Sequence, residues 1–272
     1  MELVVFDLDG TLLNADSQVS TFTQETLARM VARGIPYTVA TGRTLQASRA
    51  VLRNQGFRLP QAFKNGVLIW QPEVAAFSQL KTLTPGEIRK VESGLDAVGL
   101  TPYVFTLEDD AQHAIYRDGP RSDAERLLES YQISQGLELR PASDLRPDAT
   151  IINISAIGPA DAIGTVRDLV AGEPLLVSYT GQISEASELN WIDIHHSDAS
   201  KGSAVDLLRE QLGAERIICF GDGDNDLSMF ERADESFAPA NGAAEVRDAA
   251  TDVIGHHDDD GVARYLRQRY RL

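Results

Sequence analysis

The chain has 272 residues, 43% of them hydrophobic, so it can bury one large core or two modest ones. Its 41 acidic residues outnumber its 25 basic ones and give a formal net charge of −16, which repels nucleic-acid backbones and anionic membranes and excludes both as expected partners. A chain this acidic binds an anion only where a bound cation or a few placed Lys and Arg side chains reverse the charge locally.

The sequence favours a reduced compartment. Cys219 is the single cysteine and lies in an apolar run, which is typical of a small buried thiol in a strand. The first residues resemble a strand and not a secretory signal. No apolar run approaches the roughly 18 to 20 residues that span a bilayer. We therefore expect a cytoplasmic protein that exists as a monomer or a homodimer.

Strand-like apolar runs alternate with helical patterns at both ends of the chain. The expected strands are 3–6, 35–40 and 216–220. The expected helices are 21–33, 44–54 and 201–212, each followed closely by a glycine suited to end it. This alternation predicts an α/β fold, with a Rossmann-like, mostly parallel sheet and helices on both faces.

The middle of the chain has longer amphipathic helices and more polar strands. The expected helices are 85–98, 122–132 and 159–170, each with a Pro or Ser near its start. The expected strands are 103–107, 114–117, 150–157 and 175–179. We predict an inserted α/β (α+β) domain over 83–186, and a core domain made of 1–82 and 187–272.

Two acidic residues follow the first expected strand. In the run Asp7-Leu8-Asp9-Gly10-Thr11, Gly10 permits the sharp turn that keeps both carboxylates near one point. Ligands of parallel sheets gather at the carboxyl ends of the strands, so both side chains should project into such a crevice. Neighbouring carboxylates repel each other unless a hard cation such as Mg²⁺ bridges them. The alternative is a turn in which the Asp side chains cap backbone amides.

A second acidic turn follows the strand 216–220. It reads Gly221-Asp222-Gly223-Asp224-Asn225-Asp226. So many acidic and amide side chains in one turn are costly unless a cation or a phosphate organises them. A calcium loop is the rival interpretation, but its final Gly and distal Glu are absent here. Each acidic strand end is therefore expected to supply half of a metal cage.

Two further elements suit an anion. Thr41-Gly42-Arg43 joins an expected strand to an expected helix, where a hydroxyl and free N–H groups form an anion site and Arg43 adds charge. An ordinary N-cap by Thr41 is the alternative. Lys201 opens the helix 201–212, and a lysine at the positive end of a helix dipole invites an anionic partner. A lone surface lysine is the alternative there.

Taken together in chain order, the four elements resemble those of the haloacid dehalogenase superfamily of phosphohydrolases. That order is 7–11, 41–43, 201 and 221–226. The insert lies between Thr41-Gly42-Arg43 and Lys201 in the sequence, which is similar to the position of the large α/β cap in the Cof-type branch, subclass IIB. Further runs that look like that branch are Asn65-Gly66-Val67, Asn241-Gly242 and Asp260-Gly261-Val262-Ala263. The resemblance implies that the insert is a cap domain that selects the substrate.

The resemblance also implies roles for the polar residues. Asp7 would be the nucleophile and Asp9 the general acid and base. Mg²⁺ would be held by the Asp7 side chain, the Asp9 backbone carbonyl and Asp222, with Asp226 supporting or ligating. Whether Asp224 or Asp226 is the auxiliary metal ligand stays open. The residues implied to hold the substrate phosphate are Thr41, Gly42, Arg43, Lys201 and Asn225.

The resemblance implies a Mg²⁺-dependent phosphatase that works through an aspartyl-phosphate on small metabolites, such as sugar phosphates, sugar-acid phosphates or phosphorylated cofactors. An Asp at position 9 is similar to the phosphatases and mutases, whereas the related ion-pumping ATPases carry Thr there. A phosphomutase is therefore the first alternative. A non-catalytic module that binds phosphometabolites is the second, and the intact pair Asp7 and Asp9 argues against it.

Overall fold

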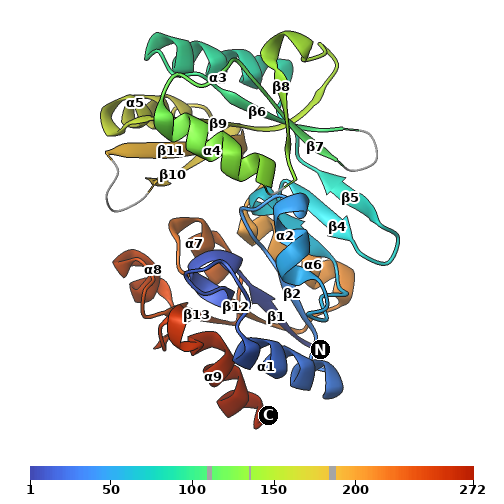
Figure 1. Ribbon diagram of the computed structural model, residues 1–272. Coiled ribbons are helices and arrows are strands. Elements are labelled where there is room, and N and C mark those ends of the chain that lie inside the picture. The colour runs from blue at the N-terminus through green and yellow to red at the C-terminus, as the bar shows by residue number, and fades with distance from the viewer. Residues whose placement is uncertain (109–111, 135, 184–187) are drawn as a thin grey trace. The chain divides into compact units, whose positions relative to one another are not determined.

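The computed structural model describes residues 1–108, 112–134, 136–183 and 188–272. The chain divides into two compact units (Figure 1). Unit 1 consists of Met1–Gln79 and Ala199–Leu272, and unit 2 of Leu80–Asp198. Within the described residues, no helix is both long and apolar enough to cross a membrane.

Unit 1 is built on a parallel sheet. Its described strands lie in the order β14-β13-β12-β1-β2. Their bounds are β1 Glu2–Phe6, β2 Tyr37–Val39, β12 Arg216–Phe220, β13 Glu235–Pro239 and β14 Asp252–Ile254. The central strands β1 and β12 are almost wholly buried, which explains their continuous apolar sequences.

Helices cover both faces of this sheet. Their bounds are α1 Thr21–Ala32, α2 Leu45–Leu52, α6 Lys201–Leu212, α7 Asp224–Phe230, α8 Ala244–Ala249 and α9 Gly261–Tyr270. On one face, Val5 of β1 shares a buried cluster with Leu208 of α6 and Met229 of α7. On the other face, Phe220 of β12 packs against Tyr265 of α9, with ring centroids 5.8 Å apart. The predicted α/β fold is confirmed.

A small second sheet follows α2. Its strands are β3 Gln61–Phe63, β4 Leu68–Gln71 and β5 Ala76–Leu80. An isolated parallel bridge between Ala40 and Ala62 connects it to the end of β2. The turn η2, Lys64–Gly66, lies between β3 and β4 and belongs to the site described below.

Unit 2 is an α+β module. Its described strands lie in the order β10-β11-β9-β6-β7-β8, and all pairs are antiparallel except β7 with β8. The strands are β6 Tyr103–Leu107, β7 His113–Arg117, β8 Glu138–Pro141, β9 Thr150–Pro159, β10 Leu176–Gln182 and β11 Leu189–His196. The helices are α3 Pro85–Ala97, α4 Asp123–Ser134 and α5 Ala160–Ala171.

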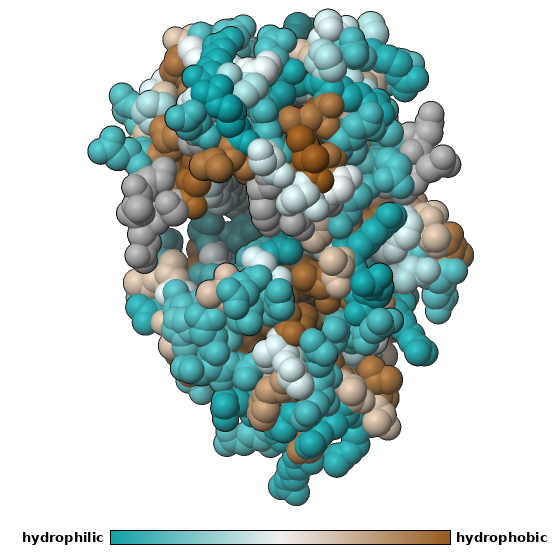
Figure 2. Space-filling model, viewed as in Figure 1, coloured by the Kyte–Doolittle hydropathy of each residue, from teal (hydrophilic) through white to brown (hydrophobic). Residues whose placement is uncertain are grey.

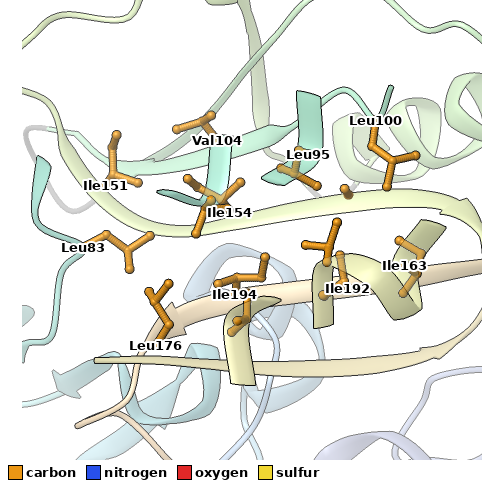
Figure 3. Close-up of a cluster of buried hydrophobic side chains, with 14 of the residues drawn as sticks. Leu83, Leu95, Leu100, Val104, Ile151, Ile154, Ile163, Leu176, Ile192 and Ile194 are labelled. Atoms are coloured by element: carbon orange, nitrogen blue, oxygen red, sulfur yellow. The ribbon is translucent and has the colours of Figure 1, made fainter. Parts of the chain in front are cut away.

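One face of the unit 2 sheet forms an apolar core with α3 and α5. Figure 3 shows Val104, Ile154 and Ile192 of the strands pointing toward Leu95 of α3 and Ile163 of α5. All five side chains are buried. Figure 2 shows, by contrast, that mainly hydrophilic residues cover the visible surface of the molecule, which agrees with the high net charge.

The second boundary between the units falls later than predicted. We expected the core to resume at 187, a residue that lies outside the described ones. Strand β11 follows it and pairs with β9 and β10 of unit 2, so unit 2 extends to Asp198. The first boundary, between Gln79 and Leu80, lies close to the expected position.

Candidate active site

The parallel register of unit 1 brings distant parts of the chain to one edge of the sheet. Phe6 of β1 aligns with Phe220 of β12 and with Val39 of β2. Asp7 and Gly221 come directly after the first two of these strands, and the Asp7 N–H donates to the Phe220 carbonyl (2.9 Å). Residues that follow these strands therefore meet at one edge of the sheet.

Three of the predicted residues form a buried acidic cluster at this edge. One carboxylate oxygen from each of Asp7, Asp222 and Asp226 lies within 4.8 Å of the others. Asp7 is 6% exposed and Asp226 is fully buried, whereas Asp222 is half-buried. The hydroxyl of Thr11 donates to Asp222 Oδ1 (2.8 Å) and so connects the turn after β1, η1 (Leu8–Leu12), with the turn after β12.

Lys201 supplies positive charge to this cluster. It is the first residue of α6, which begins there because the Ser200 hydroxyl accepts a hydrogen bond from the Ser203 N–H (2.9 Å). Lys201 is 1% exposed, and its Nζ donates to Asp7 Oδ1 (2.6 Å) and to Asp226 Oδ1 (2.5 Å). The anionic partner expected for a lysine at this helix end is present.

Burial and repulsion perturb the protonation of the cluster. Burial raises the pKa of Asp7 well above its usual value, although Lys201 opposes the shift, and neighbouring carboxylates add to it. Burial, followed by repulsion from Asp226, raises the pKa of Asp222 to about 6. Burial by itself lowers the pKa of Lys201, but the two carboxylates outweigh it and raise the pKa above its usual value. Such shifts are typical of functional sites.

Asp226 and Asp224 occupy different environments. Asp226 Oδ1 accepts from Lys201, and its Oδ2 accepts from the N–H groups of Asp222 (2.8 Å) and Gly223 (2.9 Å). Asp224 is exposed at the start of α7. Of the two residues between which the sequence could not choose, the structure places Asp226 in the acidic cluster. Both oxygens of Asp226 have partners, so it holds Lys201 and the turn in place.

The side chain of Asp9 lies outside the acidic cluster. It is exposed, and the Arg43 guanidinium binds both of its oxygens: Nε donates to Oδ2 (2.7 Å), and Nη2 donates to Oδ1. We predicted Arg43 as a phosphate ligand, and in this structure its guanidinium pairs with Asp9. A two-point contact of this kind fixes the orientation of a carboxylate as well as its position.

Thr41 is buried and does not cap α2. Its Oγ1 accepts a hydrogen bond from the Arg43 N–H (3.1 Å), within the loop 41–43. The cap of α2 is Thr44, whose hydroxyl accepts from the Ala47 N–H (3.1 Å). The alternative role of Thr41 as an ordinary helix cap is therefore wrong.

Asn65 joins the site although the sequence analysis gave it no role. It has a left-handed backbone conformation (φ 55°), which Asn tolerates, and it is 3% exposed. Its Oδ1 accepts from Asn225 Nδ2 (3.0 Å), and its N–H donates to the Thr41 carbonyl (2.9 Å). Asn65 thus connects the loop 41–43 with the turn after β12. A polar Asn-Gly pair between two apolar runs was the signal for it in the sequence.

The donor set of the cluster fits a hard divalent cation. Three carboxylates and one ammonium leave an excess of negative charge in a largely buried site. Uncompensated buried charge is costly, and carboxylate oxygens are the ligands that Mg²⁺ prefers. Asp7, Asp222 and Asp226 could therefore hold such an ion.

Comparison with known proteins agrees with this geometry. A family model described as haloacid dehalogenase-like hydrolase matches residues 4–266. The 5-amino-6-(5-phospho-D-ribitylamino)uracil phosphatase YitU of Bacillus subtilis (strain 168) is 27% identical over 99% of this chain and 98% of its own. A phosphoglycolate phosphatase of Methanopyrus kandleri is 25% identical over 98% of this chain and 96% of its own.

A solved structure shows the same fold. The HAD subclass IIB sugar phosphatase BT4131 superposes with a TM-score of 0.78 at 18% identity, covering 100% of both chains. The likeness therefore includes unit 2 as well as unit 1. Because the family model matches nearly the whole sequence, the chain belongs to the haloacid dehalogenase-like hydrolase family, and it is a phosphatase of the phosphoric monoester hydrolase class.

Proposed function

We propose that this protein is a Mg²⁺-dependent phosphatase of small phosphorylated metabolites and that it forms an aspartyl-phosphate on Asp7. The observation that carries the proposal is the buried contact of Lys201 with Asp7 and Asp226. Phosphoryl transfer needs a positioned nucleophile and neutralisation of the phosphoryl oxygens more than any unusual group. This cluster places the Asp7 carboxylate beside the Lys201 ammonium at the end of β1.

Mg²⁺ would be held by the side chains of Asp7 and Asp222 and by the backbone carbonyl of Asp9, with Asp226 supporting. When bound, the ion supplies positive charge to the phosphoryl oxygens. Support comes from the excess negative charge of the cluster and from the raised pKa values of Asp7 and Asp222. Burial, and after it repulsion between the carboxylates, disfavours their charged forms, and a bound cation stabilises those forms.

The chain's own residues would carry out two displacements. The carboxylate of Asp7 attacks phosphorus while the bond from phosphorus to the leaving oxygen breaks, and Asp9 gives its proton to that oxygen. Water then attacks the phosphorus of the aspartyl-phosphate, its proton passes to Asp9, and phosphate leaves as the Asp7 carboxylate is restored. The exposed position of Asp9, beside but outside the cluster, suits a group that exchanges protons with the substrate and with water.

The remaining site residues would bind the transferred group. The proposed phosphate ligands are Thr41, Gly42, Arg43, Lys201 and Asn225. The loop 41–43 and Asn225 are held to each other through Asn65, which supports a common role. Arg43 would divide its contacts between the phosphate and Asp9, since its guanidinium has several donors.

We assign substrate selection to unit 2, as a cap domain. The relatives are named for a phosphorylated ribitylaminouracil and for phosphoglycolate, and the structural neighbour is named a sugar phosphatase. Sugar phosphates, sugar-acid phosphates and phosphorylated cofactors are accordingly the substrate classes that we propose for this chain.

A screen of phosphorylated metabolites with Mg²⁺, scored by phosphate release, tests the proposal. The parent protein should release phosphate from at least one member of these classes, and the Asp7→Asn variant from none. Release without any bisphosphate activator separates hydrolysis from a phosphomutase reaction. Equal phosphate release by the parent and by Asp7→Asn would contradict the assigned nucleophile.

A further inference from the structure

We infer that Asn241, in the loop between β13 and α8, is a positioning residue that holds the two acidic turns of the site in register for the cation. The inference deepens the proposed function and rests on its metal site. Asn241 lies two residues after β13, so it reaches the same sheet edge as the acidic turns.

The amide of Asn241 has one orientation. Its Nδ2 donates to the backbone carbonyl of Gly10 (2.7 Å), and its Oδ1 accepts from the backbone N–H of His257 (3.0 Å). A carbonyl only accepts and an N–H only donates, so a flipped amide would lose both bonds. The partner His257 is itself anchored, since its ring bonds the Leu13 carbonyl through Nδ1 (2.7 Å).

The same loop also forms a hydrogen bond with the second acidic turn, which carries Asp222. Two residues after Asn241, the N–H of Ala243 donates to the backbone carbonyl of Asp222 (3.0 Å). Between them, Gly242 lies against the Asp222 backbone. The loop 241–243 therefore bonds the main chain of both turns, through a side chain to the first and through its backbone to the second.

Gly10, next to Thr11, is a second point where the two turns touch. It has a φ of +67°, and a Cβ built on it would lie 2.2 Å from Asp222 Oδ2. The Gly10 backbone thus runs directly along a carboxylate of the acidic cluster. Gly10 has no side chain that could hold its own backbone in place. The hydrogen bond from the Asn241 side chain to the Gly10 carbonyl does so.

This link opposes the repulsion within the site. In the absence of a cation, the excess negative charge of the cluster favours separation of the turns that carry Asp7 and Asp222. A separated pair of turns must be drawn together when the ion binds, and that cost weakens binding. Groups that orient metal ligands typically change metal affinity by about 10- to 100-fold when they are removed.

The test uses Mn²⁺ as the probe, with free Mn²⁺ measured by electron paramagnetic resonance in the full chain without substrate. The variants are Asn241→Ala and Asn241→Leu, since Leu has the branched skeleton of Asn but cannot donate or accept a hydrogen bond. Gln211→Ala is the control, because Gln211 is an exposed amide on α6 of the same unit. We expect both Asn241 variants to bind Mn²⁺ at least tenfold more weakly, and the control to bind it as the parent does.

A second measurement separates positioning from folding. Thermal unfolding in EDTA should show the Asn241→Leu variant folded, so that the loss of Mn²⁺ affinity is specific to the site. Parent-like Mn²⁺ affinity in either folded variant would overturn the inference and leave the proposed metal site standing. A parent that binds no Mn²⁺ would overturn both.

Discussion

Replacing Lys201 with Met should destabilise unit 1 strongly. The Lys201 ammonium is 1% exposed and lies 2.6 Å and 2.5 Å from two buried carboxylates, so the variant leaves Asp7 and Asp226 without their cation. Breaking a buried ion pair in this way costs about 3–5 kcal/mol. For a domain of this size that lowers Tm by roughly 6–20 °C. Met fills a similar volume, so the loss is electrostatic and not a cavity effect.

Calorimetry at pH 8 measures this effect. EDTA is present so that no metal ion replaces the charge of Lys201. Arg232→Met is the matched control, because Arg232 forms an exposed ion pair with Asp206 within the same unit, and such pairs contribute about 0–1 kcal/mol. Adding Asp226→Asn to Lys201→Met should restore part of the stability, since the amide oxygen can still accept from the turn while one stranded charge disappears. A Lys201→Met variant that melts with the parent would refute the electrostatic account of the cluster.

Three other outcomes follow from the same geometry. Asp7→Asn should lower turnover of an aryl phosphate by at least about 10³-fold, yet raise Tm in EDTA because it removes a buried negative charge. Mn²⁺ affinity should fall by up to about tenfold per pH unit below pH 6, because the ion must then displace a proton from Asp222, whose pKa is about 6; an equal affinity at pH 5 and pH 8 would exclude this. Arg43→Met should reduce kcat of the aryl phosphate reaction by about tenfold or more by freeing Asp9, with Arg43→Lys no better because it lacks the two-point contact.

The metal-free fold should respond to pH with the opposite sign to metal binding. A carboxyl whose pKa is raised in the folded state binds its proton more tightly there than in the unfolded chain, so its ionisation costs stability. The cost from Asp222 is absent below its usual pKa of 3.8 and is complete above about 6. This group therefore makes the metal-free chain less stable as pH rises through that window, and denaturant unfolding in EDTA at several pH values measures the slope.

Those elements whose local sequence is consistent with their burial could be predicted. The helix 201–212 has its limits at Ser200, which caps it, and at Gly213, which adopts the left-handed conformation (φ 61°). Residues 217–220 of the strand 216–220 form a continuous apolar run because both faces of the strand are covered there. In such segments, local propensity and tertiary burial favour the same structure.

Strand β11 could not be predicted in the same way. Its sequence includes Asn190, Asp193 and His195, and these polar residues interrupt the apolar pattern that would indicate a strand. In the structure the strand lies between β9 and β10. Asp193 is nevertheless buried, because Asn153 and Ser155 of the neighbouring strand donate to it. The burial of Asp193 is explained only by its partners on β9, which the sequence does not reveal. For this reason β11 was not assigned to unit 2, and the boundary was predicted too early in the chain.

Within the site, the meeting of residues at strand ends was predictable, whereas contacts that depend on a side-chain rotamer or on the path of a loop were not. Asp7 and Asp222 had to converge because parallel strands end at one edge. The contact of Arg43 with Asp9 depends on the rotamers of a flexible guanidinium, and the contact of Asn241 with Gly10 depends on the path of a loop. Neither leaves a periodic or spacing signal in the sequence.

The charge distribution of unit 1 explains how so acidic a chain can accept an anionic substrate. Residues 26–72 contain seven Lys or Arg and no Asp or Glu, although the whole chain carries a net charge of −16. This segment supplies Thr41 and Arg43 to the site, so two of the phosphate ligands that we propose lie in a locally basic stretch of the sequence. On the other side, a divalent cation bound as we propose would cancel the charge that Lys201 leaves uncompensated among the three carboxylates. Such a cation and Arg43 would together offset the negative field of the rest of the chain near the site. Ionic strength should therefore affect substrate affinity less than the net charge implies, since opposite contributions from the acidic surface and the basic segment are screened together.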